Sequence, residues 1–156
     1  MYCAGKDSTF VFLEDVLTEV TDLFPYGLVH IGGDECPKAR WKECPRCQRR
    51  MRDEGLGSEE ELQSYFVRRI ERFLASRNRR MVGWDEIRQG GLSETAIVLS
   101  RKREQGLRSA LENGNDVIMT PYLNCYFDYY QGSRETEPLA FGGFLPLRTA
   151  YDLDPF

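Results

Sequence analysis

The chain has little that suits a membrane or a nucleic acid. No apolar run in its 156 residues approaches the roughly 20 residues that a transmembrane helix needs. No basic run alternates with aromatic residues, and the net charge of -4 disfavours a polyanion as the partner. The segment Met1–Gly5 leads directly into a polar turn, so we expect no signal peptide here and an amino terminus cut from something longer. The 41% of hydrophobic residues suffices for one domain with a core.

Histidine is nearly absent, with one residue, His30, against five cysteines. Cys44 and Cys47, with Cys36 upstream, have a spacing that suits three zinc ligands or a redox pair. A structural zinc site needs four ligands, and His30 lies inside a predicted strand. We therefore expect free thiols or one local disulfide, and no metal or organic cofactor. A zinc-stabilised interaction module built on these three cysteines is kept as an alternative.

Helical and extended patterns alternate along the chain. Apolar residues at helical spacing predict helices at residues 10–24, 45–53, 59–74 and 107–111. Short apolar runs predict strands at residues 28–31, 81–84, 96–100 and 116–119. Such alternation is typical of a parallel sheet with helices packed outside it. The expected fold class is α/β, about four parallel strands with outer helices, which is half of a (β/α)8 TIM barrel. Residues 132–156, rich in glycine and proline, are expected to form an irregular tail of the same domain.

The stretch Val29–Glu35 joins a strand to two glycines and two carboxylates. Gly32 and Gly33 allow the backbone to turn tightly or to approach a ligand. Asp34 and Glu35 follow at the carboxyl end of a strand expected to be buried, which is where an α/β barrel carries its chemistry. Because adjacent carboxylates repel, burial of both would favour the protonated form of one, as a general acid requires. An acid pair that only opens a solvated turn is the alternative interpretation.

Three motifs in order carry a resemblance to a known family. The string His-Ile-Gly-Gly-Asp-Glu, residues 30–35, resembles the signature of the family 20 glycoside hydrolases, the β-N-acetylhexosaminidases. The string Val-Gly-Trp-Asp-Glu, residues 82–86, resembles that family's next strand end. Asp-Val-Ile-Met-Thr-Pro, residues 116–121, with Tyr-Phe-Asp at 126–128, resembles a later strand and loop. The resemblance implies that residues 1–156 are a partial catalytic (β/α)8 barrel domain, about strands 4 to 7.

The resemblance also implies a reaction, the retaining hydrolysis of terminal non-reducing β-linked GlcNAc or GalNAc. In this family the 2-acetamido oxygen of the substrate is the nucleophile, and an oxazolinium intermediate forms. Asp34 would orient the acetamido group and stabilise the intermediate. Glu35 would protonate the leaving oxygen and then activate water as the general base.

Further roles follow from the same resemblance. Trp84 would form a wall of the sugar pocket, Tyr126 would donate its hydroxyl to the acetamido carbonyl, and Asp128 would hold sugar hydroxyls. Ordinary packing or a solvated loop position remains the alternative for each of the three. His30 is expected either to support the site residues from behind or to be buried and hydrogen-bonded, and not to transfer protons. The Asp85-Glu86 pair is expected to be structural or solvated.

Some residues depart from the family pattern, and these departures argue against full activity of this chain. Ser100-Arg101-Lys102 stands where relatives commonly carry Ser-Trp-Arg, so one aromatic wall of the N-acetyl pocket would be missing. The sugar-binding Arg of the family's first strand and a Trp near its last have no counterpart here. A half barrel would also leave two parallel edges open. We therefore expect this polypeptide alone to be inactive or poorly active.

Two classes of function remain open. The first is the hydrolase, and the second is a non-catalytic glycan-binding or scaffold protein that retains the fold. Glycans or glycoconjugates containing N-acetylhexosamine are the expected partners, together with a completing chain or the missing remainder of the barrel. The resemblance favours an extracytoplasmic compartment (periplasmic, secreted or lysosomal), whereas the sequence itself leaves the localisation unknown.

Overall fold

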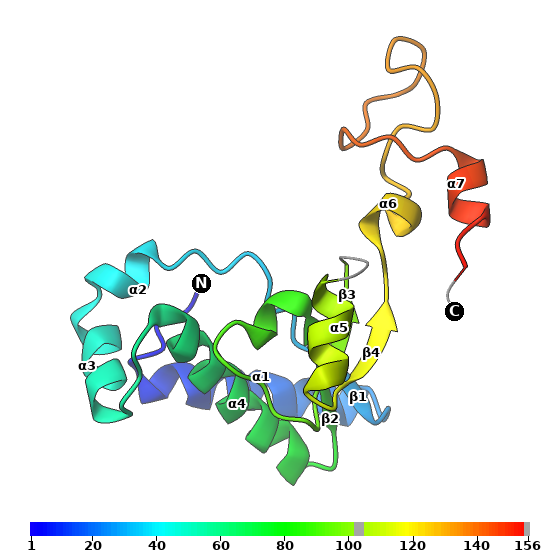
Figure 1. Cartoon of the computed structure of the whole chain (residues 1–156). Coiled ribbons are helices and arrows are strands. Elements are labelled where there is room, and N and C mark those ends of the chain that lie inside the picture. Colours follow the sequence, from blue (N-terminus) through cyan, green and yellow to red (C-terminus); the bar gives the residue numbers. More distant parts are fainter. Residues whose placement is uncertain (102–104, 155–156) are drawn as a thin grey trace.

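Four parallel strands form one sheet in the order of the sequence. The computed structural model describes residues 1–101 and 105–154. Strands β1 (Leu28–His30), β2 (Arg80–Trp84), β3 (Ile97–Ser100) and β4 (Asp116–Met119) lie side by side in that order (Figure 1). Each pair is parallel, with Val29 opposite Met81 and Val98 opposite Val117. The carboxyl ends of all four strands therefore meet at one edge, and the predicted α/β class is confirmed.

Helices connect the strands, and those at residues 7–23, 45–53, 59–76 and 105–112 lie where the sequence pattern predicts helices. The α-helices are α1 (Asp7–Leu23), α2 (Ala39–Glu43), α3 (Pro45–Asp53), α4 (Glu59–Ser76), α5 (Gln105–Glu112), α6 (Tyr122–Cys125) and α7 (Leu147–Tyr151). A short 3-10 helix, η1 (Asp85–Arg88), follows β2 directly. The tail predicted to be irregular contains α7, a single turn that begins after Pro146, where the Thr149 N–H donates to the Pro146 carbonyl over 2.9 Å. No helix of the described residues is long and apolar enough to cross a membrane.

Helix α4 begins where its capping residues predict. The Glu61 N–H donates to the Ser58 hydroxyl over 3.2 Å, and the Glu61 carboxylate accepts from the Gly57 N–H over 2.8 Å. Its apolar face packs on the core, where Leu62 and Leu74 are fully buried. Burial of one such side chain contributes about 1.5–3 kcal/mol, so this face is the main support of the helix.

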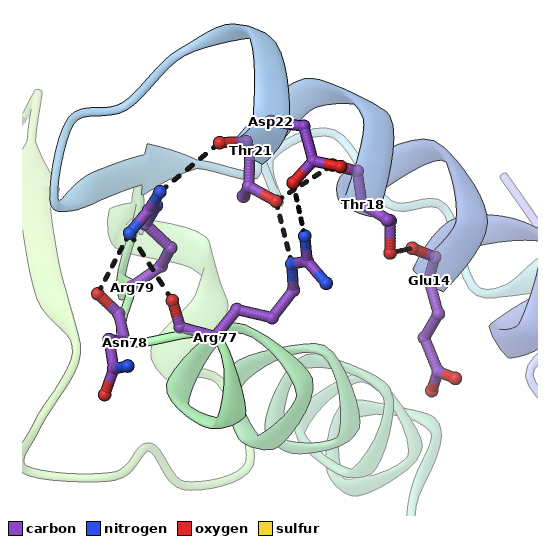
Figure 2. Close-up of polar contacts among 7 residues, drawn as sticks. All are labelled: Glu14, Thr18, Thr21, Asp22, Arg77, Asn78 and Arg79. Atoms are coloured by element: carbon purple, nitrogen blue, oxygen red, sulfur yellow. Dashed lines mark hydrogen bonds and ion pairs between the residues drawn. The ribbon is translucent and has the colours of Figure 1, made fainter.

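A polar contact joins the far ends of α1 and α4 (Figure 2). Arg77, at the end of α4, donates from Nε to the Thr21 hydroxyl over 2.9 Å and pairs with Asp22 over 2.6 Å. The same Thr21 hydroxyl donates to the Thr18 carbonyl, and Arg79 reaches the Thr21 carbonyl. These bonds keep the two helices together beneath the amino-terminal ends of β1 and β2, opposite the edge that carries the acids.

The sheet is buried at its centre and exposed at its sides. Val82 and Val98, in the two central strands, are 4% and 0% exposed, whereas Leu28 in β1 is 52% exposed. The expectation that the first strand is buried is wrong, because β1 pairs with β2 alone within the described chain. The open edges expected of a half barrel are thus present at β1 and β4, where Ile118 is also exposed.

Candidate active site

The turn after β1 requires its two glycines. Gly32 and Gly33 have φ angles of +75° and +94°, a region that side chains rarely adopt. A Cβ atom on Gly33 would also lie 2.2 Å from the Cγ2 atom of Ile87 in η1. The Trp84 N–H donates to the Gly32 carbonyl over 2.9 Å, so the turn is held against the end of β2. Close packing and left-handed backbone together fix where the two carboxylates emerge.

The two acids leave this turn in different environments. Glu35 has a φ angle of +46°, uncommon for a residue with a side chain, so the chain changes direction between the acids. The side chain of Asp34 is 31% exposed, and Glu35 is exposed. The expectation that both carboxylates are buried is therefore wrong for this chain. Unequal surroundings nevertheless suit two acids that serve different atoms of one substrate.

A hollow of about 440 Å³ lies beside both carboxylates. Its lining includes Asp34, Glu35, Tyr2, Trp41, Gln63 and Phe66. Gln63, in α4, donates from its amide to the Gly33 carbonyl over 2.9 Å, and this bond holds the Gly32–Gly33 turn against α4. A cavity with aromatic walls and a few polar groups is the usual form of a small-molecule site.

Arg101 joins the ends of three strands. Its guanidinium lies 3.4 Å from Asp34 after β1, pairs with Glu86 after β2, and lies 4.9 Å from the centre of the Trp84 ring. Burial disfavours its charge, yet hydrogen bonding to Tyr126 and attraction by Glu86 raise the pKa of Arg101 above its ordinary value. Two of the predicted site residues, Asp34 and Trp84, therefore contact one cation, and Tyr126 lies near enough to influence the pKa of that cation.

The backbone of Arg101 is fixed by a buried acid. Its N–H donates to Asp85 over 2.8 Å, and the Ser100 hydroxyl donates to the same carboxylate over 3.3 Å. Asp85 is 8% exposed, so the expected structural role for this acid agrees with its surroundings. The neighbouring Lys102 of the departure noted above lies outside the described residues.

His30 contacts the site from the edge of the sheet. Its Nδ1 atom accepts the Gly32 N–H over 3.0 Å, and its ring packs edge-on against Trp84 at 5.1 Å. The ring is hydrogen-bonded as predicted, but it is exposed and not buried, because β1 is an edge strand. Desolvation by its neighbours lowers the pKa of His30, and nearby Asp34 opposes that shift.

Asp128 is the predicted site residue that stands apart. It is exposed in the segment after α6, and its backbone carbonyl accepts the Phe141 N–H over 2.9 Å. The hollow that it lines is formed by residues 127–141 and includes none of the other predicted site residues. Figure 1 shows this segment standing away from the sheet and from α1 and α4.

Sequence reasoning missed the part that Glu86 plays. Its side chain, 25% exposed, pairs with Arg101 through one oxygen, while the other oxygen is buried with no hydrogen-bond partner in the described structure. The signal was its place shortly after the carboxyl end of a strand, where Asp34 and Glu35 also follow β1. Glu86 is therefore part of the same polar group and not a solvated loop acid.

The cysteines group differently from the spacing-based prediction. The sulfurs of Cys3, Cys44 and Cys47 lie within 4.8 Å of one another, and Cys36, the predicted third member, contacts the sulfur of Met1 instead. All five cysteines are free. The backbone N–H of Cys47 faces the Cys44 sulfur and lowers the pKa of that thiol to about 7. Burial raises the pKa of Cys47 to about 12.

Comparison with known proteins gives concordant results. The model of the glycosyl hydrolase family 20 catalytic domain matches residues 1–156. A β-hexosaminidase of Porphyromonas gingivalis is 52% identical over 156 residues, covering 99% of this chain and 20% of that protein. A β-hexosaminidase of Vibrio furnissii is 38% identical, covering 94% of this chain and 24% of that protein.

Solved structures give the same picture. The exo-β-N-acetylglucosaminidase of Vibrio harveyi, solved with N-acetylglucosamine, superposes with a TM-score of 0.85 at 31% identity, covering 97% of this chain and 24% of that one. The chain therefore spans about a fifth to a quarter of the length of these relatives.

Proposed function

The chain belongs to glycosyl hydrolase family 20, and from that premise we propose that it carries catalytic residues of a β-N-acetylhexosaminidase. The substrates are terminal non-reducing β-linked GlcNAc or GalNAc residues of glycans and glycoconjugates. The four strands correspond to about strands 4 to 7 of a (β/α)8 barrel, and the exposed edges at β1 and β4 are where the remainder of a barrel, or a completing chain, would pair.

One observation carries the proposal. Asp34 and Trp84, which lie far apart in the sequence, are brought to one cation at the carboxyl edge of the sheet, and Tyr126 lies near the same cation. That edge is where barrel enzymes assemble catalytic groups from the ends of several strands. A scaffold that used the fold for packing alone would have no need of this convergence.

The first step breaks the glycosidic bond with retention. The carbonyl oxygen of the substrate acetamido group attacks C1 as the bond from C1 to the leaving oxygen breaks, and Glu35 gives its proton to that oxygen. Asp34 holds the acetamido N–H and balances the positive charge of the oxazolinium intermediate. Glu35 then takes a proton from water, whose oxygen attacks C1, and the bond from C1 to the acetamido oxygen breaks, which opens the oxazolinium ring.

The accessory residues bind the sugar. The Trp84 ring forms an apolar wall, and the Tyr126 hydroxyl donates to the acetamido carbonyl, which orients it for attack on C1. His30 keeps the Gly32 turn and the Trp84 ring in place through the contacts described above. For Asp128 the sequence motif alone supports a contact with sugar hydroxyls.

Hydrolysis of 4-nitrophenyl β-N-acetylglucosaminide tests the proposal. The wild type is expected to release nitrophenol only slowly, because the barrel is incomplete, and a Glu35→Gln variant is expected to lose about 10²–10⁴-fold of that rate because it has no proton to give. A Glu19→Gln variant, which removes an exposed acid from α1, is the matched control and should keep full activity. Measurable hydrolysis at equal rates in wild type and Glu35→Gln would overturn the assignment.

A non-catalytic glycan-binding protein is the second candidate, and Arg101 favours it. This side chain fills the space between Asp34 and Trp84, where the acetamido group of a substrate would otherwise lie. Binding of N-acetylglucosamine, measured by calorimetry, without hydrolysis of the nitrophenyl substrate would support this candidate against the enzyme.

A further inference from the structure

Three cysteine sulfurs meet away from the strand ends. Cys3 belongs to the first segment of the chain, Cys44 precedes α3, and Cys47 lies in the first turn of that helix. The Cys3 sulfur lies 3.7 Å from that of Cys44 and 3.6 Å from that of Cys47. The three thiols thus bring together segments more than 40 residues apart in the sequence.

The spacing of the sulfurs suits a tetrahedral metal site. Zinc–thiolate bonds of about 2.3 Å in a tetrahedron place neighbouring sulfurs roughly 3.8 Å apart, close to the two distances in this cluster. A disulfide would need two of the sulfurs to approach to about 2.0 Å and would leave the third unused. A triangle of three sulfurs is therefore better matched to one shared ion than to a covalent pair.

Backbone N–H groups face two of the three sulfurs. The N–H groups of Cys47 and Arg46 face the Cys44 sulfur, and the Gly5 N–H faces that of Cys47. Gly5 is required for this approach, because a Cβ atom there would lie 2.2 Å from the Arg46 carbonyl. N–H groups directed at ligating sulfurs stabilise their negative charge and orient them.

The surrounding charge fits the same ion. The hollow that Gly5 and Arg46 line also includes Lys6, Arg49 and Arg50 together with two acids, Asp7 and Asp53, so basic side chains outnumber acidic ones there. Three thiolates around a divalent cation carry a net charge of about -1, which nearby cations offset. The remaining tetrahedral position is open to water or to a further protein donor.

We propose that Cys3, Cys44 and Cys47 bind a thiophilic divalent cation, zinc. The ion fastens the first segment of the chain to the α2–α3 region. The Trp41 indole N–H already donates to the Tyr2 carbonyl over 2.9 Å at this junction. Because Tyr2 and Trp41 both line the hollow beside Asp34 and Glu35, the ion stabilises one wall of the candidate active site.

Metal analysis of the purified protein, prepared without chelators, tests the proposal. About one zinc per chain is expected, and Cys3→Ser or Cys44→Ser should reduce the zinc content at least tenfold. Cys125→Ser, which alters a free cysteine of α6, is the matched control and should keep the metal. Wild type with less than one zinc per ten chains, or variants that keep wild-type zinc, would overturn it.

Cobalt binding gives a second readout that needs no folded variant. Replacement of zinc by Co²⁺ in the wild type should produce the intense near-ultraviolet absorption of thiolate–cobalt bonds, and one equivalent of Zn²⁺ should remove it. Thiol titration distinguishes metal binding from disulfide formation. A disulfide would lower the number of thiols in the denatured, metal-free protein from five to three. Absence of the thiolate–cobalt absorption, or a count of three thiols, would contradict the site.

Discussion

The guanidinium of Arg101 lies 3.4 Å from the carboxylate of Asp34. The two residues are 67 positions apart in the sequence and follow β3 and β1, which do not pair with each other. Arg101 spans the strand between them because its side chain passes over the Trp84 ring at the end of β2. One cation thereby pairs with an acid after each of β1 and β2.

Replacement of Arg101 by alanine is expected to lower the free energy of unfolding by about 1–3 kcal/mol. Glu86 would lose its cation while its second oxygen already has no hydrogen-bond partner in the described structure. Urea denaturation measures the change. Arg148→Ala is the control, because Arg148 is 90% exposed and its one ion pair among the described residues is with Asp152, at the end of its own helix. Its expected effect is below about 0.5 kcal/mol, and equal effects of the two variants would contradict the role of Arg101.

Replacement of Gly33 by alanine should be more damaging than the same change at Gly55. Both glycines have positive φ angles, which costs an alanine about 1–2 kcal/mol. At Gly33 the new Cβ also meets Ile87, which adds about 1–3 kcal/mol, whereas nothing lies within 4 Å at Gly55. Thermal unfolding compares the two variants. Similar losses in both would show that packing against η1 does not fix the turn.

The sequence predicts the repeating elements well because their signals are local. The apolar spacing of α4 and the Ser58 cap are read directly from the chain, and the structure places them where expected. The exposure of β1 could not be predicted from its apolar residues, because burial depends on which strands flank it. The short α7 has too few residues for a periodic pattern.

The candidate site is only partly predictable for a related reason. Asp34 and Glu35 follow a recognisable strand and turn, but the Arg101–Glu86 pair depends on the side-by-side order of three strands. The cysteine cluster shows the same limit. The spacing in the sequence selects Cys36 as the partner of Cys44 and Cys47. In the fold their partner is Cys3, which precedes α1.

Acidification is expected to destabilise the turn after β1 through His30. Its folded-state pKa is lowered by desolvation, so the unfolded chain takes up the proton more readily. The stabilisation is therefore fully present above the ordinary pKa of about 6.5 and is lost as the pH falls through the lowered folded value. Protonation also removes the Nδ1 acceptor of the Gly32 N–H.

A His30→Asn variant tests this pH dependence, because its side-chain oxygen can accept the same N–H without titrating. Urea midpoints at pH 7.5 and pH 5.5 are compared for the two proteins. The wild type should lose more stability between these values than the variant does. An equal loss in both would assign the pH dependence to other groups.

The most direct test of the account is the dependence of the Glu35→Gln rate on the leaving group. A dinitrophenyl leaving group needs no proton, whereas the sugar alcohol that leaves from chitobiose does. The account predicts a loss of about 10²–10⁴-fold on chitobiose and a far smaller loss in the bond-breaking step on dinitrophenyl β-N-acetylglucosaminide. An equal loss on both substrates would contradict Glu35 as the general acid.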